Sequence, residues 1–158
     1  MKRHTGTKRD GFSLLEVVIV VAIIAILAAI GIPRMSRGSK GATESALSGN
    51  LAVLRNAIDL YAAEHAGTFP TEANINTQLA QYTDVSGGVS ETKTTTHIYG
   101  PYVRSIPPLP VGAKKGGAVI AAVDGNDVGW IYDDADGTVK ANTTDTELDE
   151  AEKKYNEY

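Results

Sequence analysis

Residues 12–32 read FSLLEVVIVVAIIAILAAIGI, and this stretch decides how the chain is organised. Its 21 residues contain one charged side chain, Glu16. A helix of this length rises about 30 Å, which matches the hydrocarbon core of a bilayer. A secretory signal peptide has a shorter apolar run and a small-x-small cleavage site after it, whereas Pro33-Arg34-Met35 follows here. The pattern therefore predicts a transmembrane helix over residues 12–33.

Glu16 is the feature that a plain membrane anchor leaves unexplained. An ionised carboxylate inside a bilayer costs roughly 3 kcal/mol on insertion scales, so such a residue normally has a partner and a function. The apolar run contains no Lys or Arg to pair with it. A free α-amino group is a cation that could lie at a similar depth. Cleavage after Gly11 would create one on Phe12, four residues before Glu16.

Charge and composition narrow the classes of function. The first eleven residues carry four Lys or Arg against one Asp, a net charge of +3, which leaves −7 for the rest of the formal −4 total. An acidic remainder without a basic stripe argues against nucleic acid as a partner. The chain has no cysteine, which excludes disulfides, thiolate zinc sites and cysteine nucleophiles. Basic residues flank the apolar run on both sides, so they give only a slight preference for a cytoplasmic N-terminus.

Residues 8–17, KRDGFSLLEV, resemble the leader and cleavage motif of type IV prepilins, and the resemblance extends to Gly31-Ile32-Pro33. It implies that a prepilin peptidase removes residues 1–11 between Gly11 and Phe12 on the cytoplasmic face, and that the new Phe12 amine is N-methylated. It also implies that Glu16 attracts the Phe12 amine of a neighbouring subunit during assembly.

The same resemblance implies a helix kink around Gly31 and Pro33, where the helix extends or melts inside a filament. Proline removes a helical hydrogen bond and clashes with the preceding turn, so a local kink also follows from the residue itself. A second interpretation of Pro33 is that it marks the exit from the membrane, and the two interpretations are compatible.

An amphipathic continuation of the helix is predicted over residues 34–69. Apolar residues recur there at spacings of four, three, four and three, which places them on one helical face. Gly67 and Pro70 indicate the end of the helix. His65 lies at that end and is interpreted as a capping or surface residue. The face comprises Leu47, Leu51, Leu54, Ile58 and Tyr61.

Residues 70–142 are predicted to form a globular head. A short helix is expected over 71–83, a mobile loop over 84–97 and an extended segment over 100–110. Strands are expected over 118–123, 128–132 and 138–141, with Asp136-Gly137 in the turn of a hairpin. The fold class is therefore α+β, a long helix packed on a small antiparallel sheet. Residues 143–158 form a polar tail, expected to be solvated or frayed despite a Thr144-x-x-Glu147 capping pattern.

Two stretches of the head, GPYVRSIPPLP and VGWIYDDADGTVKAN, resemble the C-terminal region of major pseudopilins from type II secretion systems. In that family loops of the sheet hold a calcium ion, and clustered Asp, Asn and carbonyl oxygens suit calcium. The same residues also fit ordinary tight turns. The family's Asp-Pro-Trp-Gly element is replaced here by residues 108–112, so both interpretations stay open. The candidate calcium ligands are Asp124, Asn126, Asp127, Asp133, Asp134 and Asp136.

No catalytic residue is predicted. The chain has no Gly-x-Ser-x-Gly elbow, and His4, His65 and His97 share no metal-ligand spacing. A membrane-anchored binding domain is the alternative of a different class, with a shallow site lined by aromatic residues. Aromatic residues in a small sheet more often form its core. Such a site would use Tyr99, Tyr102, Trp130 and Tyr132.

The resemblance implies a structural subunit of a type IV pilus-like filament, and more specifically a major pseudopilin that assembles into a periplasmic pseudopilus for protein export. A surface type IV pilin and a competence pseudopilin are the alternatives within this class. The implied location is the bacterial inner membrane, crossed once, with the head in the periplasm. The implied partners are further copies of the chain in a helical filament, the prepilin peptidase, the inner-membrane assembly platform and minor pseudopilins.

Overall fold

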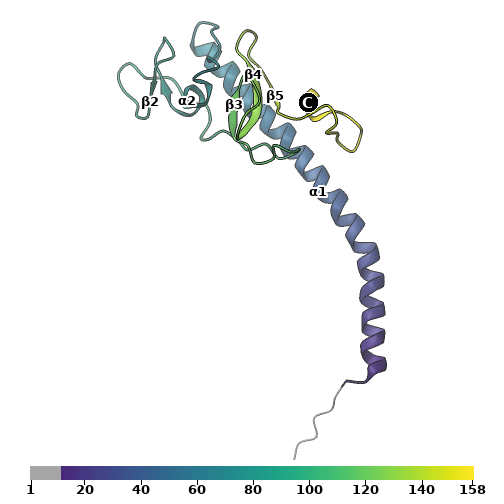
Figure 1. Ribbon diagram of the computed structural model, residues 1–158. Coiled ribbons are helices and arrows are strands. Elements are labelled where there is room, and N and C mark those ends of the chain that lie inside the picture. Colours follow the sequence, from purple (N-terminus) through teal and green to yellow (C-terminus); the bar gives the residue numbers. More distant parts are fainter. Residues whose placement is uncertain (1–11) are drawn as a thin grey trace, which may run out of the picture. The chain divides into compact units, whose positions relative to one another are not determined.

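The computed structural model describes residues 12–158, except for the side chains of residues 30–39 (Figure 1). The chain divides into two compact units, Met1–Ser39 and Lys40–Tyr158. The first helix, α1 (Leu14–Glu64), contributes to both of them. The predicted cleavage residue Gly11 lies outside the described residues.

The described part of the first unit is helical from Leu14 onward. The carbonyl of Ser13 accepts the first helical hydrogen bonds, from the amides of Glu16 and Val17 at 3.1 and 3.2 Å. The backbone stays helical through Gly31 and Pro33. Because the side chains there lie outside the described part, the kink remains a prediction.

In the part of the chain that the structure describes, no helix is found that is long and apolar enough to cross a membrane. The predicted transmembrane character of residues 12–33 is therefore not shown.

The second part of α1 carries the apolar face that its spacing predicts, and the prediction is confirmed. Leu47, Leu51, Leu54, Ile58 and Tyr61 are each at most 2% exposed. After Glu64 the backbone turns left-handed at Ala66 (φ 57°) and Gly67 (φ 83°), and the amide of Gly67 bonds to the carbonyl of Ala62 at 2.8 Å. This arrangement is a glycine C-cap, and it explains why the helix stops here.

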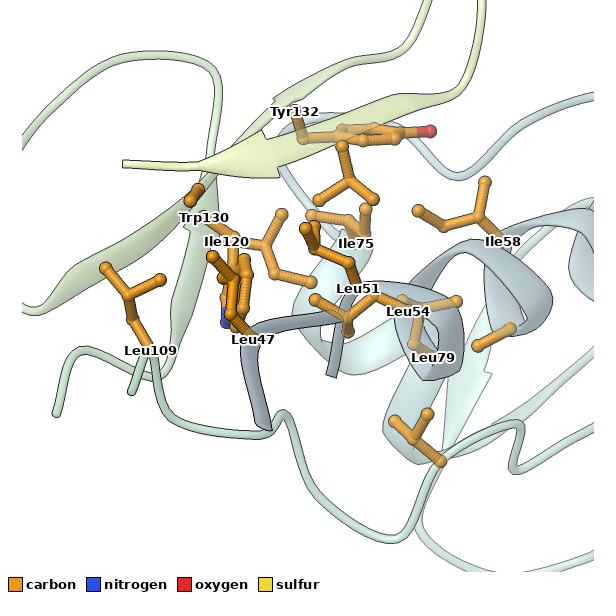
Figure 2. Packing of buried hydrophobic residues seen from close by; sticks show 14 of the residues in the cluster. Leu47, Leu51, Leu54, Ile58, Ile75, Leu79, Leu109, Ile120, Trp130 and Tyr132 are labelled. Atoms are coloured by element: carbon orange, nitrogen blue, oxygen red, sulfur yellow. The ribbon is translucent and has the colours of Figure 1, made fainter. Parts of the chain in front are cut away.

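The hydrophobic core lies between this face of α1, the short helix α2 (Ile75–Ala80) and the strands (Figure 2). Trp130 and Tyr132 are its largest buried side chains. Both satisfy their polar atoms, because the indole N–H of Trp130 donates to the carbonyl of Pro107 at 2.8 Å and the hydroxyl of Tyr132 donates to the carbonyl of Pro70 at 2.9 Å. Buried aromatic residues with satisfied polar tips add both packing and orientation.

The main sheet has three strands in the order β3 (Val119–Ala121), β4 (Val128–Asp133) and β5 (Thr138–Ala141). The antiparallel β4–β5 hairpin is confirmed, with Asp133 opposite Thr138. The expectation of a wholly antiparallel sheet is wrong, because β3 pairs with β4 in parallel. Parallel neighbours usually need a long crossover. Here β3 is so short, about 10 Å, that residues 122–127 are enough to bring the chain back.

The short helix is smaller than the predicted segment 71–83, and it supports the sheet through one side chain. Asn76 on α2 donates to the carbonyl of Ile120 at 2.8 Å and accepts from the amide of Ile120 at 2.9 Å. Asn76 thereby pairs with the backbone of β3 as a neighbouring strand would. The chain leaves helical geometry at Gln81 and continues into β1 (Tyr82–Thr83).

The segment expected to be a loop, residues 84–97, contains the second strand of a small hairpin. β1 pairs antiparallel with β2 (Val89–Ser90). The carboxylate of Asp84 accepts from the amides of Ser86 and Gly88, both at 2.9 Å, which is the way Asp stabilises a turn. Asp84 therefore stabilises the turn within this segment.

The C-terminal segment differs from the solvated or frayed tail that we expect from its composition. It ends in a 3-10 turn, η1 (Tyr155–Glu157), and Tyr155 and Tyr158 pack against the core. Arg55 on α1 donates to the carbonyl of Tyr158 at 2.5 Å. The expected capping contact is present, since Glu147 accepts from the amide of Thr144 at 2.8 Å, but no α-helix follows it. The two tyrosines anchor a segment that is otherwise polar.

Gly129 on β4 is a position where only glycine fits. A Cβ atom there would lie 2.1 Å from the carbonyl oxygen of Gly117, which is a backbone atom. We expect Gly129→Ala to lower the free energy of unfolding by about 1–3 kcal/mol, as overpacking does. Pulse proteolysis in urea measures the free energy of unfolding of the two proteins. Gly125→Ala is the matched control, because its Cβ would meet only a side-chain methyl at 3.4 Å. Equal stability of the two variants would contradict the close approach of Gly117 and Gly129.

Candidate functional site

The residues that the sequence assigns to processing and assembly lie at the start of the described chain. Phe12 is 84% exposed and precedes α1. Glu16 is exposed in the first turn of α1, where the helix dipole favours a carboxylate. A shallow pocket is lined by Phe12, Glu16, Val17, Val20 and Val21. The carboxylate is therefore accessible and lies beside the residue whose amine cleavage would expose.

Around Glu16 the helix carries apolar side chains on all sides. The large aliphatic residues between Leu14 and Leu27 range from 49% to 82% exposed. Full burial of one such side chain is worth on the order of 1.5–3 kcal/mol, so together they strongly favour an apolar environment. These residues are Leu14, Leu15, Val17, Val18, Ile19, Val20, Val21, Ile23, Ile24, Ile26 and Leu27.

The candidate calcium ligands form two groups at opposite ends of β4. The first group, residues 124–127, precedes the strand, and the second, residues 133–136, begins with its last residue, Asp133. A six-residue strand is about 20 Å long, so the two groups do not share one site. All six side chains are exposed.

Four of the acidic side chains already make contacts within the protein. Asp124 pairs with the ammonium of Lys114 at 2.8 Å, and this hydrogen bond is the main cause that holds the pKa of Asp124 below its usual range. Asp133 and Asp136 accept from backbone amides two residues further on, as turn residues do. Asp134 accepts from the amide of Glu72 at 3.3 Å.

Among the residues that the structure describes, no group of three His, Cys, Asp or Glu side chains is placed to hold a metal ion. The contacts of Asp133 and Asp136 match the alternative interpretation of ordinary turns, and calcium binding by the six residues remains a prediction.

The aromatic residues of the alternative binding site are not gathered on an open surface. Trp130 and Tyr132 are at most 1% exposed and belong to the core. Tyr99 and Tyr102 are half-buried, and their rings lie against His65 at 5.2 and 6.5 Å between centroids. These four rings are therefore used for packing in the head.

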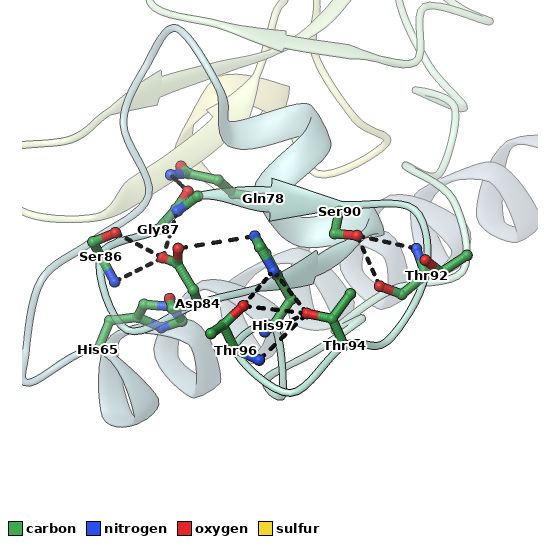
Figure 3. A network of polar contacts seen from close by, with 11 residues as sticks. His65, Gln78, Asp84, Ser86, Gly87, Ser90, Thr92, Thr94, Thr96 and His97 are labelled. Atoms are coloured by element: carbon green, nitrogen blue, oxygen red, sulfur yellow. Dashed lines mark hydrogen bonds and ion pairs between the residues drawn. The ribbon is translucent and has the colours of Figure 1, made fainter.

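His65 is not the surface residue that we expect from its place at a helix end. It is 4% exposed and stacks on Tyr61 with 3.8 Å between ring centroids. The backbone carbonyl of Asp84 contacts the His65 ring, and Gln78 donates to the carbonyl of Gly87 nearby in the chain (Figure 3). Neither Asp84 nor Gln78 was predicted from the sequence as a functional residue. A signal for His65 is nevertheless present, because it follows Tyr61 by four residues and so continues the spacing of the buried face.

Comparison with known proteins identifies one motif. The prokaryotic N-terminal methylation motif matches residues 6–32. Those residues therefore carry the prepilin cleavage signal of type IV pilins and pseudopilins. The match supports a type IV pilin-like or pseudopilin subunit, which is a structural class and not a class of enzymes. No curated protein and no solved structure matches the chain significantly.

Proposed function

We propose that this chain is the major subunit of a pseudopilus, a periplasmic filament that a type II secretion system assembles for protein export. The observation that carries the proposal is Glu16, the single carboxylate between residues 12 and 32, exposed and set among aliphatic residues with no covering partner in the described part of its unit. Its role is to attract the Phe12 amine of the next subunit, while the aliphatic side chains pack into the filament core.

The proposed partners follow from these two roles. A prepilin peptidase would cut between Gly11 and Phe12, and further copies of the chain would supply the amine and the apolar surroundings. An inner-membrane assembly platform and minor pseudopilins would complete the machinery. Before assembly, residues 12–33 would cross the inner membrane once, with the head on the periplasmic side.

The choice of a pseudopilus over a surface pilus rests on the head. Many surface pilins close a variable C-terminal loop with a cysteine pair, and this chain has no cysteine. Instead, its C-terminal segment is held by Tyr155 and Tyr158 against the core and by Arg55. The presence of Glu16 favours a major subunit, since minor initiating subunits can lack it.

Intact-mass spectrometry of the protein from its native membrane tests the processing step. The expected mass is that of a chain beginning at Phe12 plus one methyl group. Gly11→Val is expected to leave the full-length precursor, because the bulky side chain occupies the cleavage position. Gly6→Val, in the leader but away from the cut, is the matched control and should be processed. A wild-type chain beginning at Met1 in cells with an active peptidase would contradict the proposal.

A second measurement separates the two kinds of filament. Deleting the gene should cause exported proteins to accumulate in the periplasm while surface filaments stay unchanged. If the deletion instead removes surface filaments and export continues, the chain is a surface pilin. Both outcomes are compatible with the processing result, so they test the finer assignment alone.

A further inference from the structure

Strand β5 lies at one end of the strand order β3-β4-β5, so one of its sides is an edge of the sheet. Asn142, which directly follows β5, donates its amide to the carbonyl of Gly129 on the β4 side at 2.9 Å. In an antiparallel ladder the backbone groups of alternate residues face the partner strand. Val139 and Ala141 therefore direct their backbone amides and carbonyls away from β4, toward the edge of the sheet.

An open strand edge is a template for pairing with another chain, because its amides and carbonyls are ready to bond to an added strand. A second copy of this protein offers the same edge, and two identical edges pair around a twofold axis. When Val139 of one copy bonds to Ala141 of the other, Lys140 faces Lys140. The edge of β5 is thus complementary to itself in its backbone.

Residues 143–158, which we call the strap, cover this edge. The carbonyl of Ala141 accepts from the amide of Thr143 at 3.0 Å, and the carbonyl of Val139 accepts from Arg55 on α1 at 3.4 Å. The turn η1, near the end of the strap, lies against β5 (Figure 1). Both edge carbonyls therefore have a partner within their own chain.

The strap has an internal structure of its own. Leu148 and Lys154 form an isolated antiparallel bridge. The carboxylate of Asp149 lies in the turn between them and accepts from the amide of Lys153 at 2.8 Å. The same carboxylate accepts from the hydroxyl of Tyr158, whose ring centre lies 4.3 Å from the ammonium of Lys153. These contacts make the strap a small hairpin, so it opens and closes as one piece.

Apolar and polar contacts hold the strap on the head. Tyr155 and Tyr158 pack against the hydrophobic core. Arg55 donates to the carbonyl of Tyr158 at 2.5 Å and also to the carbonyl of Val139, so one guanidinium joins the strap to the strand that it covers. The two tyrosine rings are the apolar anchors, and their removal is the direct way to open the strap.

Charge and the opposite edge of the sheet point to the same role. The strap carries six Asp or Glu against two Lys, a net charge of −4. Lys140 is exposed on β5, and like charges directly opposite each other destabilise a strand pair. At the other edge, Asn76 occupies the amide and the carbonyl of Ile120 on β3. Natural sheets block strand addition with charges and with covering segments, and this sheet has both.

We propose that the strap protects the sheet from strand addition by a second copy of the chain. While the strap is closed, the β5 edge is covered. When the strap opens, the β5 edges of two copies pair antiparallel with Lys140 at the centre. This role concerns contacts between heads, so it does not rest on Glu16 or on the assembly of a filament.

Hydrogen exchange of the full-length chain in detergent micelles measures opening of the strap. The amide of Ala113 reports on it directly, because its acceptor is Glu147 in the strap at 2.5 Å. In the double variant Tyr155→Ser, Tyr158→Ser, we expect the protection factor of this amide to fall at least about tenfold, since burial of one large side chain outweighs that factor. Tyr155→Phe is the matched control, because it keeps the ring, and its protection should stay within about twofold of wild type.

Disulfide trapping measures pairing of the opened edge. The chain has no cysteine, so one introduced thiol reports on one position. Residues directly opposite in an antiparallel pair lie at a spacing that a disulfide spans. Lys140→Cys should give about tenfold more linked dimer in the double serine variant than with the strap intact, in proportion to opening. Val123→Cys, exposed beyond β3, controls for random collision and should give the same small amount in both backgrounds.

Each outcome decides for or against the proposal. Faster exchange at Ala113 without linked dimers of the Lys140→Cys chain would show that an open edge does not pair, and would overturn it. Unchanged exchange in the double variant would refute the anchoring role of the tyrosines, and the proposal with it. Protection of the amide of Ile131, which pairs with Lys140, shows that the head is folded. If the double variant does not fold, Tyr155→Ser alone should give both changes to a smaller extent, and their absence would contradict the proposal.

Discussion

Replacing Glu16 by leucine is expected to lower the yield of filaments more than a hundredfold while the leader is still removed. Glu16 is the single charged residue between positions 12 and 32. In an apolar filament core, its loss would leave the amine of the neighbouring subunit without a counter-charge. Removing one partner of a buried ion pair costs about 3–5 kcal/mol, which corresponds to a factor of more than 100 in an equilibrium constant.

The measurement is the fraction of the subunit that pellets with filaments, which are sheared from the cells or formed when the protein is overexpressed. The mass of the processed chain is measured alongside it. Glu16→Gln separates charge from shape, because it keeps the size of the side chain and removes the negative charge. Val18→Leu is the control, since Val18 is also exposed on the same helix and stays apolar. Normal filament yield from Glu16→Leu would mean that assembly does not depend on the charge of Glu16, and the proposed pairing with the neighbouring Phe12 amine would be wrong.

Replacing Trp130 by alanine is expected to lower the free energy of unfolding of the head by about 3–5 kcal/mol. Its side chain is fully buried at the centre of the three-stranded sheet, opposite Ile120 on β3 and Ala141 on β5. Its indole N–H also satisfies the carbonyl of Pro107. The substitution removes the largest buried side chain of the core and leaves a carbonyl without its partner.

Pulse proteolysis of the full-length chain in urea measures this change without tryptophan fluorescence, which the substitution removes. Trp130→Phe is the matched variant and should cost about 1–3 kcal/mol, because the ring is retained in part and the bond to Pro107 is lost. A loss below about 1 kcal/mol for Trp130→Ala would place the indole outside the core. An exposed Trp130 would bring back the aromatic surface site as an explanation for the head.

Features that depend on neighbours in the sequence could be predicted from it. The buried face of α1 follows from the spacing of five residues beginning at Leu47, since helical geometry alone puts them in line. The β4–β5 hairpin follows from the turn chemistry around Gly137, whose φ of 74° is one that glycine adopts at little cost. The processing motif is local as well, and its prediction is confirmed by the match over residues 6–32.

Features that depend on distant partners could not be predicted in the same way. The parallel pairing of β3 follows from the short length of that strand and from its contact with Asn76 on another element. The C-terminal segment is polar by composition, yet two tyrosines decide its position by packing on the core. A composition average cannot report such a contact, because one or two anchoring side chains outweigh many solvated ones.

The sequence by itself determined the processing signal, because the basic leader, the Gly11-Phe12 junction, Glu16 and the apolar run lie in one continuous stretch. The sequence also determined the buried face of α1 and the β4–β5 hairpin, because each depends on residues only a few positions apart in the chain. The tertiary structure alone decided that Asn76 pairs with the backbone of β3, and that His65 meets the carbonyl of Asp84. Those relations join residues on different elements of the chain, and only the packing of the core brings such residues together.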